Sequence, residues 1–189
     1  MLYNASFTFG SPLTIPVTAA SPMKARNIAL ERFVSMHPQY GDIVHHMASK
    51  LPEKRFMSVS MSAQLFNDKQ PMNTCVDTGW HLDGRMNPND VDHYALICFG
   101  DDGTRTLFHR LTLDCETVTS IPKTPAERQA LFSSLLAHDL HDESVGFEVP
   151  NATPVYYTTF DFHKGRAVKK PASRLFIRVL SSNHIRPAR

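Results

Sequence analysis

The stretch that decides the fold class is Met57-Ser58-Val59-Ser60-Met61-Ser62-Ala63-Gln64-Leu65. Apolar and small polar residues alternate over its whole length, and successive side chains of a β-strand point to opposite faces of a sheet. The pattern therefore predicts a half-buried strand with one apolar face and one polar face. The polar face need not be exposed to solvent, because in a barrel it can line a wet cavity.

Further strands are predicted on both sides of this stretch. They cover residues 7–9, 13–17, 94–99, 105–113, 154–162 and 174–180. Strands 94–99 and 105–113 are predicted to form a hairpin, because the turn sequence Asp101-Asp102-Gly103 separates them. Distant antiparallel strands that enclose a cavity are typical of barrels and double-sheet jelly rolls. We therefore expect a mainly β fold, with one domain over residues 1–189.

Three helices are predicted to flank the strands. Ser21-Pro22 supplies the N-cap and first-turn residues of a helix, and apolar residues at helical spacing extend this helix to Met36, before Pro38 ends it. A second, short helix is predicted over residues 43–51. The sequence Thr124-Pro125-Ala126-Glu127 is a capping box and predicts the start of the third helix.

The composition is that of an ordinary globular protein, since 42% of the 189 residues are hydrophobic and 20% are charged. A net charge of +2 predicts no strong field for nucleic acid or for a membrane surface. No apolar run reaches the roughly 20 residues that span a bilayer, and no signal-peptide pattern opens the chain. Cys75, Cys98 and Cys115 form no CxxC pair, so neither a zinc knuckle nor a disulfide framework is expected, and Cys98 is expected to be buried. These features favour a cytoplasmic protein.

The candidate metal ligands are His81, Asp83 and His163. Two imidazoles and one carboxylate are the ligand set of non-haem Fe(II) sites that keep open coordination positions. Residues i and i+2 of a strand face the same way, so His81 and Asp83 can both reach one ion. His163 follows an apolar strand and could supply the third ligand. A surface ion pair at His81 and Asp83 and a polar strand end at His163 are the simpler interpretations, but the combination favours a metal site.

Two arginines and a tryptophan accompany these ligands. Arg174 begins the next predicted strand, and a guanidinium can bind a carboxylate through two parallel hydrogen bonds. Arg178 lies four residues later, so a regular strand points both arginines to the same face. Two inward arginines would indicate a second anion, whereas a β-bulge would turn Arg178 to solvent, and both interpretations stand. Trp80 is expected to pack in the core beside the site rather than to stack on a substrate.

These segments resemble those of the 2-oxoglutarate/Fe(II)-dependent oxygenases and, within that superfamily, most resemble the taurine dioxygenase group. The sequence Trp80-His81-Leu82-Asp83 is similar to the WHxD motif of that group, and Thr106-Leu107-Phe108 is similar to its TLW segment. His163 followed by Arg174 and Arg178 has the spacing of its distal histidine and two arginines. The resemblance covers roughly residues 75–110 and 155–182.

The resemblance implies a double-stranded β-helix, a jelly-roll or cupin-like barrel, in which His81, Asp83 and His163 hold Fe(II). It implies that 2-oxoglutarate chelates the iron and that its far carboxylate pairs with Arg174, helped by the hydroxyl of Thr106. Dioxygen takes the remaining position, 2-oxoglutarate is converted to succinate and carbon dioxide, and the substrate is hydroxylated.

The expected function is that of a dioxygenase that hydroxylates a small, anionic organic molecule, with Arg178 binding the anionic group. Two alternatives stay open. The same chemistry could act on a nucleic acid or a protein side chain, which the basic residues in the C-terminal quarter would suit. The barrel could also be a non-catalytic, cupin-like binding module. Two further polar clusters are weaker candidates: residues 138–143 are expected to be a solvated helix end, and Asp92 and His93 a solvated loop.

Overall fold

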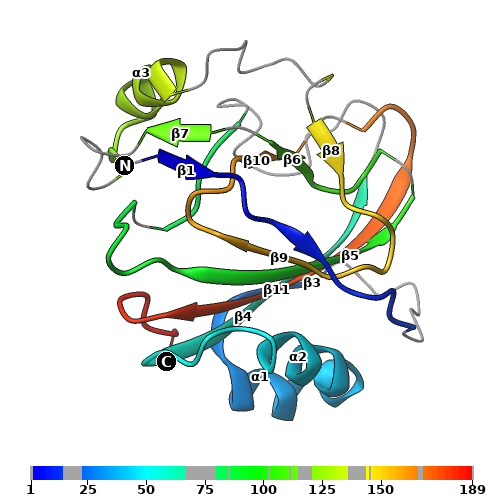
Figure 1. Cartoon of the computed structure of the whole chain (residues 1–189). Helices are drawn as coiled ribbons and strands as arrows, with labels where there is room; N and C mark the ends of the chain where they lie inside the picture. The colour runs from blue at the N-terminus through cyan, green and yellow to red at the C-terminus, as the bar shows by residue number, and fades with distance from the viewer. Residues whose placement is uncertain are drawn as a thin grey trace.

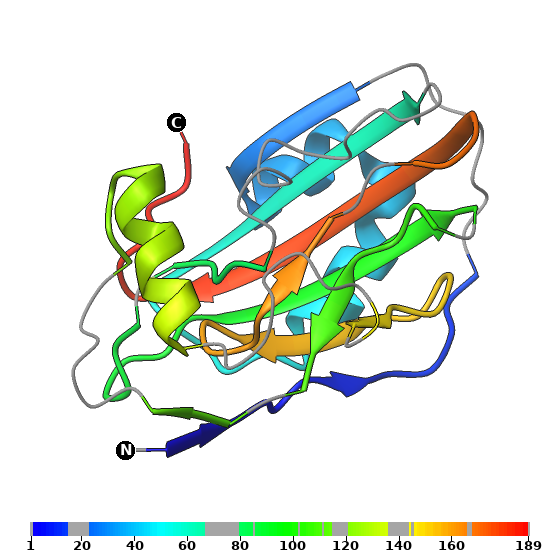
Figure 2. The same ribbon diagram turned by 90° about the horizontal axis from the view of Figure 1, so that it is seen from above.

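The computed structural model describes most of the chain, and its main feature is a six-stranded antiparallel sheet with the order β2-β9-β5-β11-β4-β3 (Figures 1 and 2). The described residues are 2–14, 23–66, 80–84, 86–101, 103–110, 112–114, 121–135, 144, 146–165 and 168–188. The strands of the large sheet are β2 (Thr8–Phe9), β3 (Met23–Ala29), β4 (Phe56–Phe66), β5 (His93–Gly100), β9 (Val155–Thr158) and β11 (Ala172–Ser182).

Two smaller antiparallel sheets lie on one side of the large sheet, and helices α1 and α2 cover its other side (Figure 1). The three-stranded sheet has the order β10-β6-β8, and β1 pairs with β7 in the two-stranded sheet. The remaining elements are β1 (Leu2–Asn4), α1 (Leu30–Met36), the 3-10 helix η1 (Pro38–Tyr40), α2 (Gly41–Ala48), β6 (Leu107–His109), β7 (Thr112–Asp114), α3 (Pro125–Leu135), β8 (Gly146–Glu148) and β10 (His163–Lys164). Helix α3 lies on the same side as the small sheets (Figure 1).

Strand β4 carries the alternating sequence, and the structure confirms both predicted faces. Val59 and Met61 belong to a buried apolar cluster together with Phe33 of α1 and Met47 of α2. The serines and Gln64 project from the opposite face of the sheet, toward the small sheets. This face is shared with the arginines of β11, because Arg174 and Gln64 occupy the same register position on adjacent strands.

The apolar core lies on both faces of the large sheet. One cluster fills the space between the sheet and helices α1 and α2. A second cluster, which includes Leu96, Phe108, Val155 and Leu180, lies between the large sheet and the three-stranded sheet. A third packs Trp80 and Phe162 against Phe132 of α3. The apolar core therefore joins the helices α1 and α2, the large sheet and the small sheets. The segments that carry the candidate ligands lie on the side of the small sheets.

The second and third predicted helices were correct, whereas the first predicted helix and the predicted hairpin were wrong. Helix α2 occupies the predicted second helix, and α3 begins at the predicted capping box. The Thr124 N–H lies 3.4 Å from Glu127 Oε2, and the Glu127 N–H lies 3.3 Å from Thr124 Oγ1. The helix predicted for residues 21–36 begins only at Leu30, since residues 23–29 form β3 and pair with the edge of β4. Ser21 and Pro22 lie outside the described residues.

The predicted hairpin of residues 94–99 and 105–113 is the second error. Strand β5 pairs with β9 and β11, whereas β6 pairs with β8 and β10 in the other sheet. The turn at Asp101 and Gly103, where Gly103 has φ +86°, therefore leads the chain from one sheet to the other. The physical reason is that β11 and β9 occupy both edges of β5, so no edge is left for a returning strand.

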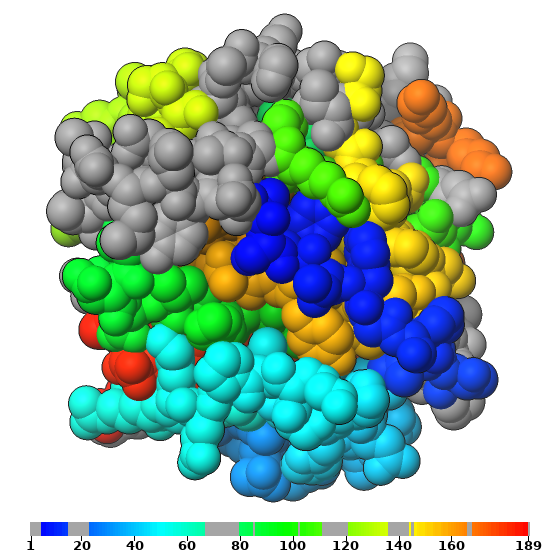
Figure 3. Space-filling model, in the orientation of Figure 1, coloured from blue at the N-terminus to red at the C-terminus, as the bar shows by residue number. Residues whose placement is uncertain are grey.

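The N-terminal segment lies across the outside of the molecule against β9 (Figure 3). Strand β2 pairs with β9 through Thr8 and Phe9 and so forms one edge of the large sheet. Mainly antiparallel β structure with flanking α-helices is thus confirmed, and no closed barrel forms within the described residues. None of the helices in the described part of the chain is long and apolar enough to cross a membrane.

Candidate metal centre

The two candidate histidines face each other across a backbone bridge. The His81 N–H donates to the His163 carbonyl and the His163 N–H donates to the His81 carbonyl, both at 3.0 Å. This antiparallel bridge adds His81 to the edge of β10. Directly paired residues project their side chains to the same face, and the two imidazole centroids are 4.5 Å apart. The backbone therefore brings together two residues that are 82 positions apart in the sequence (163 − 81).

Asp83 completes a group that could bind a metal ion. Its Oδ2 atom lies 3.3 Å from His163 Nε2, and one ligand atom from each of His81, Asp83 and His163 lies within 4.8 Å of the others. At metal–ligand distances of ~2.1 Å, two ligand atoms on one ion are at most ~4.2 Å apart, so small side-chain rotations suffice to close the site. The predicted convergence of the three side chains is therefore present, and two imidazole nitrogens with one carboxylate oxygen suit Fe(II) or another divalent transition metal.

The ring of His163 is oriented by a hydrogen bond at its Nδ1 atom. The Nδ1 atom lies 3.1 Å from the carbonyl oxygen of Asp161, and a carbonyl can only accept a hydrogen bond, so Nδ1 carries the hydrogen. In the neutral imidazole this leaves the lone pair on Nε2, which faces Asp83. A lone pair and a carboxylate oxygen at this separation repel each other, and a proton or a metal ion between them would remove that repulsion. A second partner of this kind is typical of metal-ligating histidines.

Asp161 anchors the turn that delivers His163. Its carboxylate, which is fully buried, accepts hydrogen bonds from the N–H and hydroxyl groups of Thr158 and from the N–H and hydroxyl groups of Ser6. The bonds to Ser6 tie the N-terminal segment to the same turn. Asp161 was not identified from the sequence, because no motif marks a buried hydrogen-bond acceptor.

Arg178 lies directly on the candidate metal site. Its Nη1 atom donates a close, charged hydrogen bond to Oδ2 of Asp83, and its guanidinium lies over the ring of Tyr94 at 5.4 Å from the centroid. Strand β11 pairs without interruption with β4 and β5, so no bulge turns Arg178 away from Arg174. The interpretation with a bulge is therefore wrong, and the anion that Arg178 contacts is Asp83.

The electrostatic environment keeps Asp83 ionised. Burial by itself would raise the pKa of Asp83, but the charges of Arg178 and of His163 hold the pKa well below its ordinary value. The hydroxyl of Tyr157 lies 3.4 Å from Asp83 Oδ2 and donates to it. Burial raises the pKa of Tyr157 far above that of a free phenol, so the hydroxyl stays a donor. Tyr157 was not identified from the sequence, where it is one of several tyrosines in an apolar strand.

Arg174 and Thr106, the predicted cosubstrate-binding residues, both lie beside Cys98. Arg174 is 6% exposed and donates to Gln64 Oε1 at 3.1 Å and to the Thr104 carbonyl at 3.4 Å. Burial raises the pKa of the Cys98 thiol, and the nearby charge of Arg174 and a hydrogen bond with Thr106 act in the opposite direction. Cys98 is fully buried, as predicted. The Arg174 guanidinium is therefore held in place by polar contacts on the same face of the sheet as Arg178.

The prediction of a solvated loop at Asp92 is wrong. Asp92 is 0% exposed, and its carboxylate lies beside Gly84, immediately after the candidate ligand Asp83. Trp80 is also fully buried and packs against Phe162 and Leu107, as expected for a core residue next to the site. Residues 138–143, like Cys75 and Cys115, lie outside the described residues.

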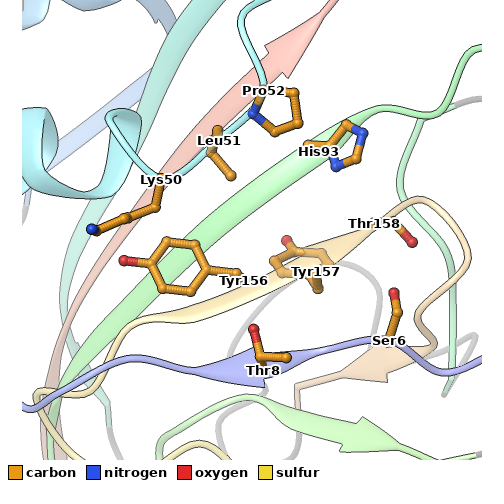
Figure 4. A pocket seen from close by; sticks show the side chains of 9 residues that line it. All are labelled: Ser6, Thr8, Lys50, Leu51, Pro52, His93, Tyr156, Tyr157 and Thr158. Carbon is orange, nitrogen blue, oxygen red and sulfur yellow. The ribbon is translucent and has the colours of Figure 1, made fainter.

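A shallow cavity of about 140 Å³ lies next to Tyr157 (Figure 4). Its lining includes Lys50, His93 and Tyr156, together with hydroxyl-bearing residues of β2 and β9. Burial and the nearby Lys54 lower the pKa of His93. None of the predicted site residues lines this cavity.

Comparison with known proteins gives no relative for this chain. It matches no protein-family model, no curated protein and no solved structure. The functional assignment therefore depends on the geometry of the site and on the sequence motifs.

Proposed function

We infer that the protein is an Fe(II)- and 2-oxoglutarate-dependent dioxygenase that hydroxylates a small, anionic organic substrate and releases succinate and carbon dioxide. The observation that carries this proposal is the convergence of His81, Asp83 and His163, with one ligand atom of each within 4.8 Å of the others. This ligand set leaves three positions on one face of a six-coordinate metal. A chelating 2-oxo acid and dioxygen need three positions.

The arrangement of the sheets supports a double-stranded β-helix as the fold. The six-stranded and three-stranded sheets are both antiparallel and lie face to face with an apolar cluster between them. His163 comes from the smaller sheet, and the arginines come from β11 of the larger one. The candidate ligands and the candidate anion-binding groups therefore project into the same layer.

Each residue has a distinct role in the proposal. His81, Asp83 and His163 hold the iron, and the Asp161 carbonyl fixes the ring orientation of His163. When bound, iron with 2-oxoglutarate and dioxygen supplies the oxidation of an unactivated C–H bond, coupled to decarboxylation of the 2-oxo acid. Arg174 binds the far carboxylate of 2-oxoglutarate, since it is the buried cation on this face.

Thr104 and Gln64 support that role of Arg174. Both accept hydrogen bonds from the guanidinium and hold it on this face of the sheet. Thr106 is buried and forms a hydrogen bond with Cys98, whose thiol also lies near the charge of Arg174. A guanidinium at this depth suits a carboxylate ligand, because it can donate two parallel hydrogen bonds to the carboxylate oxygens.

The test is succinate formation from 2-oxoglutarate by the purified protein with Fe(II) and dioxygen. We expect turnover, even without a substrate, at a slow uncoupled rate that His81→Ala and Arg174→Ala abolish. His46→Ala and Arg32→Ala serve as matched controls, because both residues are exposed on α2 and α1. Equal turnover in His81→Ala and the wild type would refute the site, and absence of any turnover with a panel of anionic substrates would refute the function.

A further inference from the structure

The Oδ2 atom of Asp83 is shared by several groups. Arg178 Nη1 donates to it, the Tyr157 hydroxyl lies 3.4 Å from it, and His163 Nε2 lies 3.3 Å from it. The Asp83 and Arg178 side chains are 22% and 26% exposed, so the pair is only partly in contact with solvent. The charge of Asp83 is therefore already neutralised by the protein itself.

A metal ion at the site would need the same carboxylate. Two like charges at the separation of neighbouring ligands repel strongly in a partly buried site, since the interaction scales inversely with distance and with the local dielectric constant. A divalent cation on Asp83 would therefore repel the guanidinium of Arg178. A metal ion that binds Oδ2 would compete directly with Arg178 for this atom.

The surroundings of Arg178 allow the guanidinium to move while its backbone stays fixed. Its backbone is held on both sides, opposite Ser60 of β4 and Leu96 of β5. Its long side chain lies over the face of Tyr94, and an aromatic face stabilises a cation over a range of positions. Ser60 and Ser62 of the adjacent strand are half-buried on the same face. The guanidinium can thus leave Asp83 and still lie over a polar surface.

We propose that Arg178 competes with the metal ion for Asp83, and that metal binding releases its guanidinium to bind an oxyanion, so that metal and anion bind cooperatively. This inference rests on the proposed metal centre. The anion is a carboxylate, sulfonate or similar group, because a guanidinium matches such oxygens with parallel N–H donors. Linkage is reciprocal, so the anion must raise metal affinity by the same factor by which the metal raises anion affinity.

The experiment is anaerobic titration of the full chain with Co(II), followed by calorimetry and by the visible absorption of the bound ion. Arg178→Gln removes the competing charge, so it is expected to bind Co(II) roughly 5- to 150-fold more tightly than the wild type, the usual range of coupling between sites. Lys170→Gln is the control, since it removes an exposed cation near the start of β11 that does not contact Asp83, and its Co(II) affinity is expected to stay within about twofold of the wild type. Arg178→Met also removes the charge, is expected to show the same gain, and keeps the test valid if Arg178→Gln fails to fold. Arg178→Lys keeps the charge and is expected to bind Co(II) like the wild type.

A second arm tests the anion. Sodium sulfate, compared with a neutral osmolyte and with sodium perchlorate at matched ionic strength, is expected to tighten Co(II) binding to the wild type and to leave Arg178→Gln unchanged. Sulfate complexes in solution lower the concentration of free Co(II). They would therefore make binding to the protein appear weaker, not tighter. An effect of perchlorate equal to that of sulfate would assign the change to ionic strength and overturn the anion part of the proposal.

The outcomes separate this inference from the proposed function. Co(II) binding to the wild type that Asp83→Asn abolishes supports the metal centre. If Arg178→Gln then binds Co(II) no more tightly than the wild type, the competition is overturned and the metal centre stands. If the wild type and Arg178→Gln both fail to bind Co(II), or if Asp83→Asn binds it equally well, the metal centre fails and the competition fails with it.

Discussion

Gly84 lies so close to Asp92 that a Cβ atom on the glycine would be 2.5 Å from the Oδ2 atom of the aspartate. The same Cβ would be 2.6 Å from the hydroxyl of Tyr94. Asp92 and Tyr94 are buried, and their side-chain oxygens have no hydrogen-bond partner in the described part of the structure. The backbone of Gly84 also has φ +69°, in the left-handed region. The residue after Asp83 is therefore restricted to glycine by both space and backbone conformation.

Gly84→Ala is predicted to lower the free energy of unfolding by about 1–3 kcal/mol, the usual cost of a non-glycine residue in the left-handed region. The displaced backbone should also move Asp83 and weaken Co(II) binding. Urea unfolding and Co(II) titration measure the two effects. Gly41→Ala is the control, because Gly41 is helical and its Cβ would meet only a Val34 methyl at 3.3 Å; a change of under about 1 kcal/mol is expected there. Equal stability of Gly84→Ala and the wild type would contradict the prediction.

Asp161→Ala is predicted to destabilise the fold by at least about 2 kcal/mol, because four donors lose a charged, buried acceptor. The turn before β10 should loosen, so metal binding through His163 should weaken as well. Thermal and urea unfolding give the stability, and Co(II) titration gives the site. Asp42→Ala, at an exposed position in the first turn of α2, is the control with an expected loss below about 1 kcal/mol. A stable Asp161→Ala protein would show that the Ser6 contacts contribute little.

The stability contribution of Asp90 is predicted to depend on pH. Hydrogen bonds from Lys54 and Asn183 lower the pKa of Asp90 from 3.8 to about 2. A group whose pKa is lower in the folded state stabilises that state above its unfolded pKa, and the contribution is lost as pH falls through the folded pKa. Asp90→Asn should therefore have a lower urea midpoint than the wild type near neutral pH.

The difference in midpoint between Asp90→Asn and the wild type should shrink between about pH 4 and pH 2, where Asp90 gains its proton. Urea unfolding at a series of pH values measures it. Asp42→Asn is the control at an exposed position, and its midpoint difference should stay small across the series. A difference for Asp90→Asn that is constant with pH would contradict the role of the carboxylate charge.

Arg174→Lys is predicted to weaken 2-oxoglutarate binding by at least about tenfold, because an ammonium cannot make the parallel pair of hydrogen bonds that a guanidinium makes. Calorimetry on the Mn(II)-loaded protein without dioxygen measures this affinity. Mn(II) affinity itself should stay unchanged, since Arg174 contacts Gln64 and Thr104 rather than the ligands. Lys170→Ala removes an exposed cation near the start of β11 and should leave both affinities alone. Unaltered binding of 2-oxoglutarate to Arg174→Lys would place its carboxylate elsewhere.

Short-range patterns in the sequence were enough to predict some parts of the fold. The alternation in β4 reflects the two faces of one strand, and the capping box of α3 reflects hydrogen bonds within four residues. The convergence of His81, Asp83 and His163 was predictable for a different reason: the chemistry of metal sites restricts the residue types, and two of these three residues lie two positions apart in the sequence. Such features depend on neighbours along the chain, so they are visible without the structure.

The remaining features depend on pairing across the chain. Residues 23–29 have apolar spacing compatible with a helix, but the edge of β4 was available, and Asn27 adopts φ +55° at an irregularity in that pairing. The contact of Arg178 with Asp83 joins residues 95 positions apart, and four hydrogen bonds link Asp161 to Ser6 and Thr158. No local pattern encodes such contacts, because the sheets bring these residues together.

Strand β11 is bonded to neighbours on both sides along most of its length. Arg174 and Arg178 are therefore fixed at their Cα atoms by two full ladders of hydrogen bonds, and neither can be repositioned by remodelling a loop. An engineer who wishes to alter the proposed anion binding must work on the side chains themselves, at these two positions and at those facing them on β4, while the spacing between the two Cα atoms stays constant.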